Sequence, residues 1–261
     1  MRIIFVRHGE PDYRNDSLSE KGIADAKLTA KRIANWDVKQ FYVSPLGRAK
    51  MTAEPTLSLM NREAVTLDWI REFSYPIINE ITGKQGVCWD YKPSYWTNDS
   101  LMFSQDDWPD ASVNATNPIL REKGQEVITK LDELLAEYGY FRKDKYYINE
   151  NREERYINST VIEGNRHFAN ELPAEDAGDT IVLFCHFGVT CLMLSHLLNI
   201  PFELLLHGTI IPTCGITIVN SEEHWGKECS FRMQALGDVS HLINAGVSIS
   251  SAGSFAPLFQ F

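Results

Sequence analysis

The chain has 261 residues, of which 44% are hydrophobic, and it carries a formal net charge of −10. This length supplies enough apolar side chains for one large core, so we expect a single domain over residues 1–261. The acidic balance disfavours non-specific binding to nucleic acid or to an anionic membrane. No apolar run approaches the roughly 20 residues of a membrane-spanning helix, and the first residues do not resemble a secretory signal. We therefore expect a cytoplasmic protein, with its five cysteines reduced and mostly buried because they form no CxxC pair.

The first third of the chain alternates between strand and helix patterns. Residues 17–36 predict an amphipathic helix, because apolar side chains recur at spacings of three and four, and Ser19 is a suitable N-cap. Another helix is expected in "SPLGRAKMTAEPTLSLM". The apolar positions of the first helix are Ile23, Ala26, Ala30 and Ile33, and the predicted strands are Arg2–Val6, Gln40–Val43 and Ala64–Leu67. Such alternation is typical of parallel strands joined by crossover helices.

The pattern breaks at residues 77–117, which are rich in aromatic, Pro, Asn and Asp residues and show no clean period. A helix is expected at residues 118–138, and residues 179–200 predict a second strand, histidine, glycine and helix sequence. Further strands are expected at Cys214–Val219 and Phe231–Ala235. We predict a three-layer α/β/α fold with a mostly parallel central sheet, with the insertion of residues 77–117 lying over the C-terminal edge of the strands as a cap. The phenylalanine-containing tail could pack on the domain or on a second copy as a homodimer.

Two predicted strands each end in a histidine that a glycine follows, as His8-Gly9 and as His186-Phe187-Gly188. The carboxyl ends of parallel strands meet at one edge of a sheet, where ligands bind, so both histidines can meet there. Arg7 and Arg48 suit an oxyanion, because a guanidinium group donates parallel hydrogen bonds to phosphate oxygens. Phe187 opens the following helix, whose first turn offers backbone N–H donors and a positive dipole end.

Four ordered segments, "RHGE", "LSEKG", "SPLGRAKMTA" and "FCHFG", resemble the motifs of the histidine phosphatase superfamily on its phosphoglycerate-mutase-like branch. The resemblance implies a phosphomonoesterase of the histidine acid phosphatase type that needs no metal and no cofactor. It implies that His8 is the nucleophile and that Arg7, Arg48 and a protonated His186 hold the phosphoryl oxygens. The general acid would be a carboxylate after the third strand. Glu72 is favoured by position, and Asp68 and Glu80 remain alternatives.

Dedicated mutases of this family follow RHGE with a serine and a Trp-Asn pair, whereas here the sequence is "RHGEPDYRND". Arg14 occupies the slot of the family's asparagine and Asn15 follows it. We therefore expect hydrolysis of a small phosphorylated substrate through a phosphohistidine. A phosphoglycerate mutase is the first alternative, and a non-catalytic binder of phosphorylated ligands is the second.

The insertion is the expected source of specificity. Its aromatic residues, together with residues near the second histidine and the first loop, either line a substrate pocket or form a small satellite core beneath the loop. The candidate pocket residues are Arg14, Asn15, Tyr75, Trp89, Tyr91, Trp96 and His207.

Overall fold

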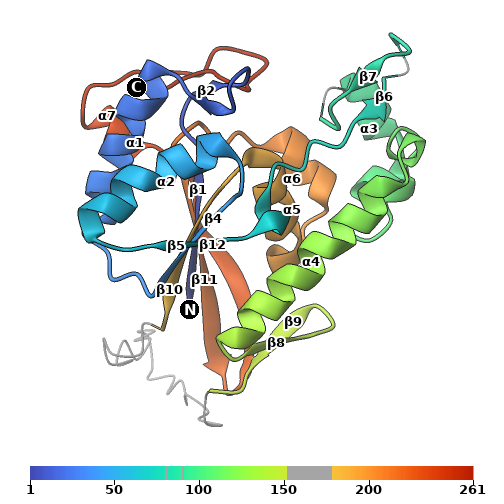
Figure 1. Cartoon of the computed structure of the whole chain (residues 1–261). Coiled ribbons are helices and arrows are strands. Elements are labelled where there is room, and N and C mark those ends of the chain that lie inside the picture. The colour runs from blue at the N-terminus through green and yellow to red at the C-terminus, as the bar shows by residue number, and fades with distance from the viewer. Residues whose placement is uncertain (80, 90, 152–177, 261) are drawn as a thin grey trace, which may run out of the picture.

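The chain folds around a mixed sheet of eight strands (Figure 1). The computed structural model describes residues 1–79, 81–89, 91–151 and 178–260. In spatial order the strands are β5 (Ala64–Thr66), β4 (Gln40–Val43), β10 (Thr180–Cys185), β1 (Arg2–Arg7), β11 (Ile216–Trp225), β12 (Glu228–Asp238), β9 (Tyr146–Asn149) and β8 (Tyr140–Lys143). Two small sheets pair β2 (Pro11–Asp12) with β3 (Ser17–Leu18) and β6 (Ile77–Ile78) with β7 (Gln85–Gly86). The predicted α/β class is therefore confirmed.

Only one half of the large sheet is parallel. Strands β5, β4, β10 and β1 run in one direction, as the alternating pattern predicts. Strands β11, β12, β9 and β8 pair antiparallel, so the prediction of a mostly parallel sheet is corrected to a mixed one. Strands β11 and β12 are longer than predicted and are separated by Gly226 and Lys227 alone. A connection that short produces a hairpin, because a parallel crossover needs a dozen or more residues.

Helices cover both faces of the sheet. On one face lie α1 (Glu20–Ile33), α2 (Gly47–Met60) and α7 (Ser240–Ile243), and on the other lie α4 (Ile119–Glu137), α5 (Phe187–Leu198) and α6 (Phe202–Gly208). The Ser19 side chain accepts a hydrogen bond from the Gly22 N–H, which confirms it as the N-cap of α1. Of the four predicted apolar positions of this helix, Ile23 is exposed and the other three are buried. Among the described residues, no helix is long and apolar enough to cross a membrane.

Successive side chains of the parallel strands point to opposite faces of the sheet and pack into two separate cores. Ile4 and Val6 of β1 pack with Ala49 of α2 on one face. Ile3 and Phe5 point to the other face, which α4 and α5 cover. The five cysteines are all buried, as expected. This two-sided burial fixes the central strands, and therefore the positions of the loops that leave them.

The insertion is an irregular series of short elements. After the 3-10 turn η1 (Asp68–Ile70) come β6 and β7, then α3 (Pro93–Asn98) and the 3-10 turns η2 (Ser100–Phe103), η3 (Trp108–Asp110) and η4 (Asn114–Thr116). Trp108 is buried, and its ring lies 4.6 Å from that of Phe202 in α6. Trp108 therefore belongs to the main core on this face of the sheet and not to a separate satellite core. Trp89, Tyr91 and Trp96 remain half-buried and belong to the site described next.

Candidate active site

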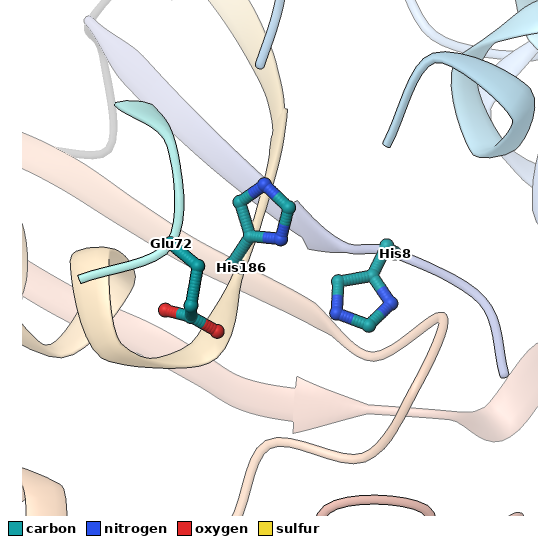
Figure 2. Close-up of side chains that lie close together, drawn as sticks. All are labelled: His8, Glu72 and His186. Atoms are coloured by element: carbon teal, nitrogen blue, oxygen red, sulfur yellow. The ribbon is translucent and has the colours of Figure 1, made fainter. Parts of the chain in front are cut away.

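The two histidines predicted to meet do so at the C-terminal edge of the parallel strands (Figure 2). Strands β1 and β10 are direct neighbours, with Arg7 paired to Cys185, so the residues that follow, His8 and His186, leave the sheet side by side. Their ring centroids lie 5.1 Å apart. Glu72 joins them from the loop after η1, and the donor atoms of the three side chains lie within 4.8 Å of one another.

The His8 ring is held in one tautomer. It is 1% exposed, and its Nδ1 lies 2.7 Å from the carbonyl oxygen of Gly9. A carbonyl can only accept, so Nδ1 carries the proton and Nε2 keeps its lone pair. Burial, followed by the nearby charge of Arg7, lowers the pKa of His8 to about 3. The ring is therefore neutral and nucleophilic at Nε2 over most of the pH range.

His186 lies fully buried at the start of α5, and its Nε2 lies 2.7 Å from the Ser44 hydroxyl. Its Nδ1 is buried without a hydrogen-bond partner in the described part of the chain. Burial, followed by the neighbouring His8 and Arg48, lowers the pKa of His186 well below 6.5. The expectation of a protonated His186 is therefore wrong for the site by itself, because these neighbours disfavour a further positive charge. A bound phosphate dianion would act in the opposite direction.

Glu72 is oriented by two backbone donors. Its Oε1 accepts hydrogen bonds from the N–H of Gly188 at 2.9 Å and of Phe73 at 3.0 Å. Burial raises the pKa of the Glu72 carboxyl above 4.5, although the charges of Arg7 and Arg48 oppose this shift. The alternative acid Asp68 is exposed, and Glu80 lies outside the described residues.

Two arginines bring positive charge to the same place. Arg7 is 5% exposed and donates through Nη1 to the Ile211 carbonyl at 2.5 Å and through Nη2 to the Ala252 carbonyl at 3.3 Å. Arg48, in the first turn of α2, donates to Asp16 Oδ1 at 2.7 Å. Both guanidinium charges lower the pKa values of the two histidines, because a nearby positive charge disfavours protonation of either ring.

His8, Glu72 and His186 also have the composition of a metal-ligand set. However, two guanidinium groups beside them repel a cation and attract an oxyanion. The electrostatics of the site therefore suit the phosphoryl group that the sequence pattern predicts better than a metal ion.

Three supporting residues were missed in the sequence. Ser44 contacts His186, and Asp16 contacts Arg48. Thr52 of α2 accepts from the Gly9 N–H at 2.9 Å and donates to the Arg48 carbonyl at 2.7 Å, which ties the loop after β1 to α2. Ser44 could have been predicted as a site residue, because it is a polar residue that directly follows a predicted strand. The other two depend on how separate loops come together.

A cavity of about 450 Å³ opens beside Arg7. The predicted pocket residues Trp89, Tyr91, Trp96 and His207 line it, as does the ring of Phe187 at the start of α5. The other predicted pocket residues do not line this cavity. The Tyr75 ring packs on Phe73 at 5.2 Å, Asn15 donates to Asp12 in the turn between β2 and β3, and Arg14 lies in that same turn.

Comparison with known proteins agrees with this geometry. The family model of the histidine phosphatase superfamily (branch 1) matches residues 3–103, which contain the segments that supply Arg7, His8, Arg48 and Glu72. A 2,3-bisphosphoglycerate-dependent phosphoglycerate mutase of Thermoplasma acidophilum is 36% identical over 73 residues, which is 24% of this chain and 36% of the mutase. The first 103 residues of the chain are therefore similar to the histidine phosphatase superfamily.

Solved structures share the fold of this chain over most of its length. A phosphoserine phosphatase of Entamoeba histolytica in complex with phosphoserine has a TM-score of 0.56 and 18% identity, over 92% of this chain and 98% of that one. A mycobacterial glucosyl-3-phosphoglycerate phosphatase has a TM-score of 0.54 and 14% identity, over 90% and 98%. The alpha-ribazole phosphatase of Shigella flexneri has a TM-score of 0.51 and 16% identity, over 91% and 96%. These similarities establish the fold, whereas the match to the curated mutase spans about a third of that protein.

Proposed function

We propose that this chain is a metal-independent phosphatase that hydrolyses a small phosphomonoester through a phosphohistidine on His8. The observation that carries the proposal is the state of the His8 ring. Its Nδ1 proton is held by the Gly9 carbonyl, its pKa is about 3, and its Nε2 is left as a lone-pair donor beside two guanidinium groups. Phosphoryl transfer needs an aligned nucleophile and neutralised phosphoryl oxygens, and this site supplies both.

In the first step, Nε2 of His8 attacks phosphorus while the ester P–O bond breaks. Arg7, Arg48 and the N-terminus of α5 stabilise the phosphoryl oxygens, and His186 donates to them once the bound dianion favours its protonated form. The Glu72 carboxyl gives its proton to the leaving oxygen, which departs as an alcohol. Its raised pKa, caused by burial, keeps that proton available at acidic pH.

In the second step, water attacks the phosphohistidine. Glu72, now a carboxylate, removes a proton from that water, the N–P bond breaks, and inorganic phosphate leaves. His8 is again neutral and Glu72 is again protonated, so one water and one ester give one alcohol and one phosphate. The two backbone N–H groups at Glu72 Oε1 hold the carboxyl in place for both transfers.

The solved structures named above are phosphatases, which supports hydrolysis, while the relative from Thermoplasma is a mutase. A phosphoglycerate mutase is therefore the second candidate. A mutase must retain a bisphosphorylated intermediate, and the second phosphate needs cationic partners. Among the described residues that line the cavity beside the site, Arg7 is the one arginine and no lysine is present, which favours hydrolysis.

The test measures phosphate release from para-nitrophenyl phosphate at mildly acidic pH with EDTA present. We compare the wild type with His8→Ala and with the control His241→Ala, whose ring contacts Thr29 and Arg32 outside the site. We expect turnover by the wild type and the control and none by His8→Ala. Quenching the reaction in alkaline denaturant should trap a phosphoenzyme that is stable in alkali and labile in acid. Undiminished turnover by His8→Ala contradicts the proposal, and isomerisation of phosphoglycerate without phosphate release identifies a mutase.

A further inference from the structure

The cavity beside Arg7 adjoins the proposed phosphoryl site through this residue. The charge of Arg7 acts on the two histidines, and its side chain also lines the cavity. The Phe187 ring lies 5.7 Å from the Arg7 guanidinium carbon and 6.4 Å from the Trp89 ring, so it connects the phosphoryl site to the aromatic wall.

One wall of the cavity is built from flat rings. The Trp96 and His207 rings stack in parallel, with centroids 4.9 Å apart and an angle of 7° between their planes. Tyr91 lies 5.4 Å from His207. Aromatic faces arranged in this way offer further stacking surface to a planar group.

Buried polar contacts hold that wall from behind. The Tyr91 hydroxyl donates to Asn114 Oδ1 at 2.6 Å, and Asn114 Nδ2 donates to the buried Glu203 at 2.7 Å. His207 Nε2 lies 3.1 Å from the other oxygen of Glu203. This pair is a close contact between charged or polar groups and not a hydrogen bond, and it sets the His207 ring beside the buried carboxylate.

The other wall comes from the C-terminal tail. Gly253 and Phe255 line the cavity, and the neighbouring Ala252 carbonyl accepts from Arg7. A Cβ at Gly253 would lie 2.5 Å from Arg7 Nη2, and this glycine has a φ of +77°, so the tail approaches as closely as it does because the residue is glycine. The Phe255 side chain is 78% exposed, which leaves most of the ring open to contact.

The cavity lining carries little charge. Among its described residues Arg7 is the one permanent cation, and no carboxylate belongs to it. A leaving group with a carboxylate or a second phosphate would lose water there and would find no cation other than Arg7, which the phosphoryl group already engages. A neutral planar group loses little hydration free energy on entering the cavity, and it gains stacking on the rings and burial of its apolar surface.

We propose that the substrate is the phosphomonoester of an uncharged alcohol that carries a flat aromatic group, and that this group binds between the Trp96 wall and Phe255 of the tail. The inference rests on the proposed function, because the group bound in the cavity is a leaving group only if the chain hydrolyses phosphomonoesters. The size of the cavity and its aromatic lining, in which Arg7 is the one permanent charge, select the class of that group.

Inert phosphonates test the inference without turnover. We would measure, by calorimetry at pH 5, the binding of 2-phenylethylphosphonate, 2-cyclohexylethylphosphonate and phosphonoacetate. The aromatic compound should bind at least about tenfold more tightly than phosphonoacetate, and about threefold more tightly than the cyclohexyl compound. Equal or tighter binding of phosphonoacetate overturns the inference, and equal binding of the cyclohexyl compound overturns its aromatic part.

A matched pair of tail variants locates the group. Phe255 lines the cavity, whereas Phe259 is similarly exposed at 77% and does not. Phe255→Ala should weaken binding of the aromatic phosphonate by about threefold to tenfold and leave phosphonoacetate unchanged, while Phe259→Ala should change neither. Equal effects of the two substitutions contradict the assignment.

The two proposals fail in different ways. Hydrolysis with a preference for carboxylate-bearing esters such as phosphoserine would reject the aromatic substrate class and leave the phosphatase function standing. Selective binding of the aromatic phosphonate without hydrolysis of any ester would reject the phosphatase and leave the binding inference standing.

Discussion

His8 and Glu72 have pKa values displaced in opposite directions by the same burial. The pKa of His8 falls to about 3 because its charged form is the cation, and the pKa of Glu72 rises because its charged form is the anion. Between these values the nucleophile is neutral and the acid is protonated. A pair of titratable groups whose pKa values are shifted in opposite directions is typical of a general acid and a nucleophile.

This opposition sets the sign of the pH dependence. Activity requires neutral His8, so kcat/KM should rise as pH increases through about 3. It also requires protonated Glu72, so kcat/KM should fall as pH increases past the raised pKa of that carboxyl, above 4.5. We expect a bell-shaped profile with an acidic optimum, measured as kcat/KM against pH because that ratio reports the free enzyme.

Glu72→Gln tests the acid itself. The amide cannot donate a proton to the leaving oxygen, so kcat/KM for an alkyl ester, which reports phosphoryl transfer to His8, should fall by about 10²–10⁴, with a much smaller loss for a nitrophenyl ester. The alkaline limb of the profile should disappear with the carboxyl. An unchanged alkaline limb in Glu72→Gln would assign that limb, and the acid, to another group.

At the scale of elements, the start of α5 matters because it holds the acid as well as His186. A Cβ at Gly188 would lie 2.9 Å from Glu72 Oε1, on the carboxylate that the Gly188 N–H now binds. Gly188→Ala should therefore displace Glu72 and lower kcat by about tenfold to a hundredfold, since small misplacements of reacting groups are costly. Steady-state kinetics with an alkyl phosphate ester measure this loss of kcat.

Gly208→Ala is the matched control for that change. Gly208 ends α6, and a Cβ there would meet nothing within 4 Å. Its kinetics should equal those of the wild type. Equal losses in both variants would show that helix substitution in general, rather than displacement of Glu72, lowers kcat.

The turn before β3 fastens the start of α2. Asp16 accepts from the Gly47 N–H at 2.6 Å and from Arg48 at 2.7 Å, and it adopts a left-handed φ of 46°. Asp16→Ala should raise KM about fivefold with a smaller change in kcat, because Arg48 loses its partner, and should cost about 1 kcal/mol of stability. Asp16→Asn, which tolerates this backbone region better, should recover part of both losses. Steady-state kinetics and urea unfolding test these values.

At the scale of the whole molecule, the site depends on strands buried from both sides. Phe184 of β10 is fully buried, directly before the strand end that carries His186, and it packs on Phe41. Phe184→Ala should lower the free energy of unfolding by about 3–5 kcal/mol. Val65→Ala, on the exposed part of edge strand β5, should cost less than about 0.5 kcal/mol. Urea unfolding of the two variants measures this difference, and similar losses would contradict the packing described.

Local patterns in the sequence determined the parallel half of the sheet and the positions of Arg7, His8, Arg48 and His186. This succeeded because each of these residues lies at or just after a strand end, or in a helix that directly follows one, and parallel strands place all such ends at one edge. The same patterns could not determine the antiparallel half of the sheet, because an apolar run has the same appearance in either direction.

Only the tertiary structure decided which side chains complete the site. The hydrogen bonds from Ser44, Thr52 and Asp16, and the approach of Gly253 to Arg7, join segments that are far apart along the chain. The protonation of His8 and His186 was decided in the same way. A pKa depends on burial and on neighbouring charges in space, and neither quantity is local in the sequence.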